Sequence, residues 1–278
     1  MPIDLTTVNR LSDETPVLVD LKPSGQHYME DFFAAGGLGA VLRELRDRLH
    51  LDCLTVTGET LGARLDGDDA WVDRAVIRSV REPFQAVGGL VALFGSLAPG
   101  GAILKRSAAD ARLFESEGRA VAFDSLEDLA ARIDDPTLDV TPTDFLVLKN
   151  AGPKGAPGMP EAGYLPIPTK LSRAGVTDMV RISDARMSGT AFGTIVLHVT
   201  PEAAAGGPLA AVRSGDRIRL SVKERRIDVL VEPSELARRA ADARRTVTPP
   251  RGYRRLYAEH VLQADHGCDF DFLVGSRP

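Results

Sequence analysis

The spacing of apolar positions along the chain changes near residue 85. Before that point, an apolar run at Val17–Leu21 leads through a Pro-Ser-Gly turn into Met29–Leu49, where apolar residues recur at helical spacing around a soft Gly-Gly pair. A β-branched run at Leu51–Thr57 follows, and Thr60–Leu65 could begin another helix. This order predicts a βαβ-like segment.

After residue 85, short apolar runs alternate with Gly, Pro and Asp, a pattern that favours strands joined by turns over long helices. The expected strands are Val91–Phe94, Ala102–Leu104, Arg119–Phe123, Phe145–Lys149, Met179–Ile182, Thr194–Val199, Arg217–Ser221 and Arg226–Val231. Eight short strands are typical of a barrel or closed sheet. Short helices are expected to cover it, at Ser125–Ile133 behind a serine N-cap, at Pro201–Ala205, and at Arg254–Gln263.

Composition narrows the classes of function. A net charge of -5, with both signs interspersed, provides no basic face for nucleic acid. No run approaches the roughly 18 apolar residues of a membrane span, and the first residues do not resemble a secretory leader, so we expect a cytoplasmic protein. The two cysteines, Cys53 and Cys268, lie far apart and lack metal-ligand spacing, which predicts buried, unreactive thiols.

A glycine- and proline-rich loop follows the strand expected at Phe145–Lys149. It ends at Glu161 and would present that carboxylate on a restrained backbone. Mg²⁺ prefers such oxygen ligands, which makes Glu161 a candidate metal ligand. The alternative is a connecting loop with a solvated surface glutamate.

A second candidate loop, Ser183–Gly193, joins two expected strands. An unaided Ser188 hydroxyl is a poor base, so it would need a metal ion or a neighbouring base. No Gly-x-Ser-x-Gly motif surrounds it, which disfavours a serine hydrolase. Arg186 could bind a substrate carboxylate or form a structural ion pair with Asp184, and His198 is expected to be a hydrogen-bonded core histidine.

Several motifs together resemble the dihydroxyacid and phosphogluconate dehydratase (IlvD/Edd) family over nearly the whole chain. The segments that carry the resemblance are Pro23–Phe32 (PSGQHYMEDF), Gly89–Pro99 (GLVALFGSLAP), Gly152–Glu161 (GPKGAPGMPE), Asp184–Gly189 (DARMSG) and His198–Pro208 (HVTPEAAAGGP). The wording of Val176–Thr190 is closer to the pentonate and other sugar-acid dehydratases than to the branched-chain amino-acid enzyme, which typically has Asp-Gly-Arg-Phe-Ser-Gly.

The resemblance implies a hydro-lyase that converts a 2,3-dihydroxy sugar acid into a 2-keto-3-deoxy acid. It places Ser188 at the position of the catalytic base, Glu161 at a Mg²⁺ ligand and Thr190 beside the substrate. A [2Fe-2S] cluster would assist departure of the 3-hydroxyl. The implied fold is α+β: residues 1–85 as the tail of an α/β N-terminal domain, and 86–278 as a swivelling β-barrel domain with short covering helices.

The chain departs from the family in its length and its cysteines. Family members are about twice as long, and their N-terminal half supplies the cluster ligands and further Mg²⁺ ligands. We therefore expect a chain that needs an N-terminal half, in the same or a separate chain. The resemblance also implies that it forms homo-oligomers. The alternatives are a dihydroxy-acid dehydratase of branched-chain amino-acid synthesis and a non-catalytic remnant that binds carboxylates.

Overall fold

The computed structural model describes residues 4–66, 71–163, 165–189, 191–242 and 249–275, which form two compact units. One unit is Arg10–Gly89, and the other comprises residues 4–9 and 90–275. Helices are α1 Leu5–Glu14, α2 Met29–Ala34, α3 Gly37–Glu44, α4 Leu61–Asp66, α5 Leu126–Arg132, α6 Thr169–Arg173, α7 Pro233–Asp242 and α8 Tyr253–His260. Strands are β1 Val91–Leu93, β2 Gly101–Leu104, β3 Glu115–Phe123, β4 Phe145–Leu148, β5 Arg181–Ser183, β6 Ile195–Thr200, β7 Arg217–Ser221 and β8 Arg226–Val229.

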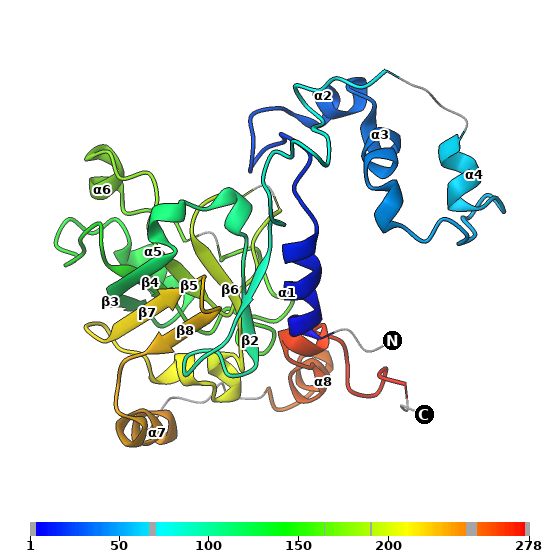
Figure 1. Cartoon of the computed structure of the whole chain (residues 1–278). Coiled ribbons are helices and arrows are strands. Elements are labelled where there is room, and N and C mark those ends of the chain that lie inside the picture. Colours follow the sequence, from blue (N-terminus) through cyan, green and yellow to red (C-terminus); the bar gives the residue numbers. More distant parts are fainter. Residues whose placement is uncertain (1–3, 67–70, 164, 190, 243–248, 276–278) are drawn as a thin grey trace. The chain divides into compact units, whose positions relative to one another are not determined.

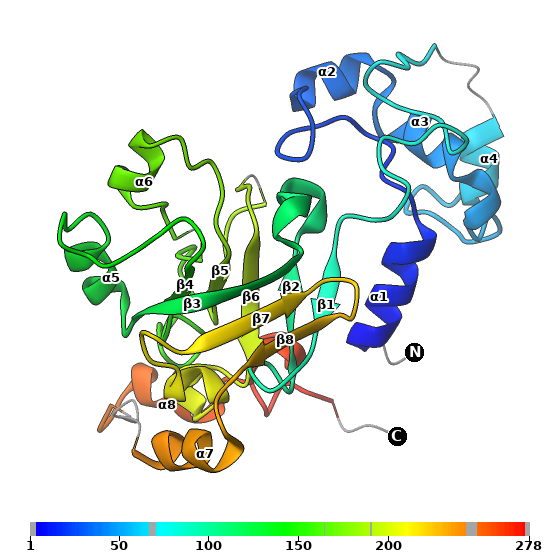
Figure 2. The ribbon, with the colours of Figure 1, turned by 60° about the vertical axis from the view of Figure 1, so that its left-hand side comes forward.

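The larger unit is built on one mixed sheet with strand order β1-β2-β6-β5-β4-β3-β7-β8 (Figure 1). Strands β3 to β6 are mutually parallel, and the pairs β1–β2, β2–β6, β3–β7 and β7–β8 are antiparallel. Phe94, just after β1, exchanges hydrogen bonds of 2.9 and 2.8 Å with Arg225 and Ile227. This bridge joins the two edges, so the sheet is nearly closed, as predicted (Figure 2).

Alternation along the central strands divides the apolar side chains between two cores. On β3, Ala120 and Ala122 face the barrel interior with Ile218 and Leu220 of β7. The intervening Val121 and Phe123 belong to a second core, together with Leu129 of α5, Leu171 of α6 and other buried residues of that face. The side-chain period of two in a strand produces this division. Ser125 caps α5 by accepting a hydrogen bond from the Asp128 N–H (3.2 Å), which confirms the predicted covering helix.

The Arg10–Gly89 unit is mainly helical in its described part, which corrects the βαβ-like prediction. Val17–Leu21 and Leu51–Thr57 contribute isolated bridges rather than strands, such as Val17 to Gln85. The helix expected over Met29–Leu49 is broken into α2, α3 and a 3₁₀ turn. Gly36 adopts φ 115° at the break, in the left-handed region where glycine ends a helix at little cost.

None of the helices in the described part of the chain combines the length and apolar character needed to cross a membrane.

Candidate functional site

Three loops leave the same edge of the sheet, because β4, β5 and β6 are parallel and end there. The loop after β4 runs to Glu161, the loop after β5 carries Arg186 and Ser188, and the loop after β6 begins with Pro201. Carboxyl ends of parallel strands are the usual place for ligand sites in sheets of this kind. The two segments singled out from the sequence are therefore neighbours in space.

Glu161 and Arg186 are in direct contact. Their side chains form an ion pair with Nη1–Oε1 of 3.1 Å, and each is close to half exposed (48% and 46%). Arg186 also donates from Nε to the Met159 carbonyl (2.7 Å), and its own carbonyl accepts from the Gly163 N–H (2.8 Å). These contacts connect the loops after β4 and β5. The partly exposed Glu161 carboxylate and Arg186 guanidinium therefore lie side by side.

Asp184 and Arg186 do not form an ion pair. This ion pair was one of the two alternatives that the sequence left open for Arg186. Asp184 is 1% exposed and accepts only backbone N–H groups in the described chain. Its oxygens bind the amides of Asn150 (3.2 Å), Ala151 (2.9 Å) and Ala203 (2.9 Å). One carboxylate therefore links the loops that follow β4, β5 and β6.

A second buried carboxylate supports the same edge. Glu202 is 1% exposed and accepts from the amides of Lys154 (2.9 Å) and Gly155 (3.0 Å) and from Nε2 of Gln263 (2.7 Å). A Cβ at Gly152 would lie 2.7 Å from Glu202 Oε2, so this close approach requires glycine. The buried Glu202 carboxylate is thus paired with backbone donors, and these hydrogen bonds restrain the start of the loop that leads to Glu161.

Ser188 lies half-buried in the loop after β5, where its carbonyl accepts from the Ala191 N–H (3.1 Å). Lys105, which follows β2, donates from Nζ to the carbonyl of the adjacent Gly189. Burial lowers the pKa of Lys105, and no described carboxylate pairs with its ammonium group. A partly desolvated positive charge therefore sits next to the Ser188–Gly189 peptide, a feature that the sequence analysis missed.

His198 departs from expectation. It adopts φ 54° within β6, and its buried Nδ1 finds no hydrogen-bond partner among the described residues, so it is not a fully hydrogen-bonded core histidine. Burial lowers the pKa of His198, and the nearby Arg186 charge lowers it further. The neutral ring therefore lies close to the Arg186 loop without a defined role.

The described residues do not provide a complete set of ligands for a metal ion. Among the described residues, no three His, Cys, Asp or Glu side chains gather in a metal-binding group. Cys53 is exposed, contrary to expectation, whereas Cys268 is partly buried with Sγ 3.7 Å from Met159 Sδ. Burial raises the pKa of the Cys268 thiol, which disfavours the thiolate that an iron–sulfur cluster needs. Glu161 could supply one carboxylate to Mg²⁺, whereas the cysteines do not fit a cluster.

Two family models match the sequence. The model for the C-terminal domain of dihydroxy-acid/6-phosphogluconate dehydratases matches residues 75–268, and the corresponding N-terminal model matches residues 1–64. The chain belongs to the dihydroxy-acid/6-phosphogluconate dehydratase family. The family resemblance carried by the sequence motifs is therefore confirmed.

Curated members of this dehydratase family align along almost the entire chain. An L-arabonate dehydratase of Azospirillum brasilense is 50% identical over 100% of the chain and 49% of its own length. A 6-deoxy-6-sulfo-D-gluconate dehydratase of Pseudomonas putida is 49% identical over 98% of the chain and 48% of its own length. A dihydroxy-acid dehydratase of Ignicoccus hospitalis is 40% identical over 97% of the chain and 49% of its own length. The chain thus spans about half the length of these relatives.

Thr190, which the dehydratase resemblance places beside the substrate, lies outside the described residues. The structure brings together Glu161 and Arg186 and places Ser188 in the same loop as Arg186. It adds Lys105, Asp184 and Glu202 to the candidate site. A Thr-Pro-Glu turn after a strand marks Glu202 in the sequence, but nothing there shows that its carboxylate is buried.

Asp184 predicts a pH dependence of stability. Burial, together with the nearby Glu202 charge, raises the pKa of Asp184 from 3.8 to about 6, although three backbone N–H groups oppose the shift. The folded state thus holds the Asp184 proton more tightly than the unfolded state does. The bound proton thus adds roughly 3 kcal/mol to the free energy of unfolding. This stabilisation is fully present below pH 3.8 and is lost as the pH rises through about 6. Denaturant unfolding between pH 4 and pH 6 should show it.

Asp184→Asn is the matched comparison for this prediction, because asparagine cannot ionise. We expect the free energy of unfolding of the variant to depend less on pH between pH 4 and pH 6. The variant should also be less stable at every pH, because its amide NH₂ group would face the backbone N–H donors that the carboxylate accepts from. Parallel pH profiles for the two proteins over this range would show that Asp184 does not titrate there.

Proposed function

We propose that this chain is the C-terminal half of a sugar-acid hydro-lyase. The reaction removes a proton from C2 and the hydroxyl from C3 of a 2,3-dihydroxy acid, so that water leaves and the enol formed tautomerises to a 2-keto-3-deoxy acid. The observation that carries the proposal is the pairing of Glu161 with Arg186 at the edge where Ser188 is presented. The relatives named as sugar-acid dehydratases support the assignment.

Ser188 acts as the base in this proposal. A serine hydroxyl holds its proton far above neutral pH, so it becomes a base only where positive charge stabilises the alkoxide. Lys105 supplies such a charge beside Gly189, and Arg186 supplies a second one from the Ser188 loop. These cations and Thr190 would also bind the substrate carboxylate and hydroxyls, because a guanidinium or ammonium matches a carboxylate acceptor.

Glu161 is the residue that would contribute a ligand to Mg²⁺. A bound Mg²⁺ would supply additional positive charge that polarises substrate oxygens. The half-exposed Glu161 carboxylate can exchange its Arg186 partner for a cation, because a solvated ion pair is held by only about 0–1 kcal/mol. The remaining ligands, and those of a [2Fe-2S] cluster, would come from the N-terminal half.

The Arg10–Gly89 unit supports the need for that N-terminal half. Several of its large apolar side chains are exposed, with Val56, Phe33, Leu54, Trp71 and Leu38 among them. Such exposure on one small unit is typical of a surface that another part of the protein covers. We assign residues 1–85 to the end of the α/β N-terminal domain, whose earlier part would cover these side chains, and residues 86–278 to the β-barrel domain.

Sugar acids are the preferred substrate class. The arabonate and sulfogluconate relatives are 50% and 49% identical to the chain, against 40% for the dihydroxy-acid dehydratase of Ignicoccus hospitalis. The test is a panel of pentonates, hexonates and 2,3-dihydroxy-3-methylbutanoate, supplied to the chain with its N-terminal half, Mg²⁺ and a reconstituted cluster. Faster 2-keto acid formation from a pentonate or hexonate supports the assignment, and a preference for the branched acid would overturn it.

Lys105 gives a test of the charge beside Ser188. Lys105→Met keeps the length of the side chain but removes its charge, and we expect kcat of the complete enzyme to fall by about 100-fold. An alkoxide base also makes this loss pH-dependent, so the variant should need a higher pH for its remaining activity. Arg173→Gln, at an exposed position on α6, is the matched control and should leave kcat and its pH profile unchanged.

A further inference from the structure

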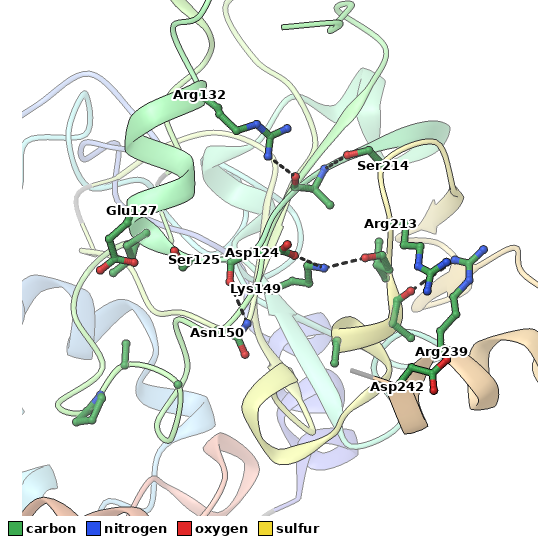
Figure 3. A pocket seen from close by; sticks show the side chains of 18 residues that line it. Asp124, Ser125, Glu127, Arg132, Lys149, Asn150, Arg213, Ser214, Arg239 and Asp242 are labelled. Carbon is green, nitrogen blue, oxygen red and sulfur yellow. Dashed lines mark hydrogen bonds and ion pairs between the residues drawn. The ribbon is translucent and has the colours of Figure 1, made fainter. Parts of the chain in front are cut away.

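A cavity of about 1040 Å³ opens where β3 and β4 end (Figure 3). Its walls are the first turn of α5, the start of the loop after β4, the turn before β7 and one side of α7. The volume is at the upper end of the roughly 300–1,000 Å³ range of small-molecule sites. Its lining does not include Ser188, Arg186 or Glu161, so the cavity is separate from these candidate site residues.

Lys149 lies in the wall of this cavity and is 7% exposed. Its Nζ donates to the Val212 carbonyl (2.9 Å). It also forms an ion pair with Asp124 Oδ1 (2.6 Å), which Figure 3 shows. An ammonium group has three N–H donors, so one of them has no acceptor among the described residues. The Asp124 side chain is 79% exposed and is a weakly held, solvated counterion.

Arg213 supplies a second cation to the lining. Its guanidinium has no partner among the described residues, whereas Arg239 pairs with Asp216 (2.8 Å) and Arg132 pairs with Asp128 (2.8 Å). The Val212 carbonyl that accepts from Lys149 belongs to the peptide that joins Val212 to Arg213. The nearly buried ammonium and the unpaired guanidinium therefore both belong to the lining of one cavity.

The lining also holds neutral polar groups. Ser125, Asn150 and Ser214 contribute hydroxyl and amide groups, which suit the hydroxyls of a small molecule. A wholly solvated cleft would not account for Lys149, because burying an ammonium beside an exposed counterion costs free energy. An oxyanion in the cavity would satisfy the third Lys149 donor and the Arg213 fork together.

We propose that this cavity is a binding site for a small hydroxylated molecule with one carboxylate or phosphate group, held by Lys149 and Arg213. Gly155, Ala156 and Pro157 line the cavity and belong to the loop that continues to Glu161. An occupant would therefore contact that loop directly, in addition to the hydrogen bonds that Asp184 and Glu202 accept from it. The binding claim itself does not depend on the dehydratase proposal.

The test is titration calorimetry of the chain with lactate, with glycerol 3-phosphate and with glycerol as the neutral comparison. Neither anion is a 2,3-dihydroxy acid, so failure of the dehydratase assignment leaves the result intact. We expect at least one anion to bind and glycerol not to bind. Arg213→Gln should weaken binding about tenfold, and Lys149→Met at least as much, because each removes one of the two cations.

Two controls locate the site. Arg173→Gln removes an exposed arginine on α6, outside the cavity, and Ser188→Ala alters the edge loop; both should bind the anion as the unmodified chain does. Because Lys149 is nearly buried, its variant is included only if thermal unfolding shows a folded protein, and the exposed Arg213 then decides. Absence of binding by both anions, binding indifferent to Arg213→Gln, or binding lost in Ser188→Ala would overturn the proposal.

Discussion

Replacing Ser188 with alanine is expected to lower kcat of the complete enzyme by about 1,000-fold, within the range that a positioned general base contributes. The variant keeps the loop after β5, since Asp184 and Arg186 hold it through their own contacts. Substrate affinity should change little, because Arg186 and Lys105 remain. The loss should therefore appear in kcat rather than in KM, measured as the initial rate of 2-keto acid formation.

Ser172→Ala is the control for Ser188→Ala, because Ser172 is an exposed serine on α6 in the same unit. It should retain full activity. Exchange of the substrate C2 proton with solvent deuterium provides a second readout, and Ser188→Ala should abolish it together with turnover. A variant that still exchanges this proton at the unmodified rate would remove Ser188 from the role of base.

Replacing Glu161 with glutamine is expected to raise the Mg²⁺ concentration for half-maximal activity by about 100-fold, since a hard cation loses one carboxylate ligand. Glutamine retains the size of the side chain but lacks the charge. Direct titration of Mg²⁺ into the complete enzyme should show the same weakening. Thermal stability should change little, because the Glu161–Arg186 pair is half exposed and contributes only about 0–1 kcal/mol.

Glu117→Gln is the matched control for Glu161→Gln. Glu117 on β3 forms a comparable half-exposed ion pair with Arg217 (2.8 Å), away from the candidate site. It should leave the Mg²⁺ dependence unchanged. Equal Mg²⁺ dependence in the Glu161 variant and the unmodified enzyme would show that Glu161 pairs only with Arg186.

The β-rich domain could be predicted well because its strands are short apolar runs bounded by glycine, proline and aspartate. All eight expected strands form, and side chains alternate between two cores as the period of a strand requires. Helix α7 was not expected, because Pro233–Asp242 is dominated by polar residues and alanine and buries none of them. In the Arg10–Gly89 unit, the apolar periodicity predicts one helix that continues through Gly36, whereas the structure ends a helix there.

The candidate site was predictable only in part. The motifs identify Glu161, Arg186 and Ser188, yet their meeting depends on parallel strands that end at one edge. Asp184 and Glu202 accept hydrogen bonds from backbone amides of loops distant in sequence, and Lys105 contacts Gly189 from the end of β2. Backbone donors carry no signature in the sequence, so such partners emerge only from the fold.

The central claim is that this chain contributes the base to a dehydratase that its N-terminal half completes. The most direct measurement is the rate of 2-keto acid formation from a pentonate by the chain alone and by the chain with that half, with Mg²⁺ and cluster reconstituted in both. Turnover is expected only in the second case. Turnover by the chain alone, or no turnover with the half supplied in folded, cluster-loaded form, would contradict it.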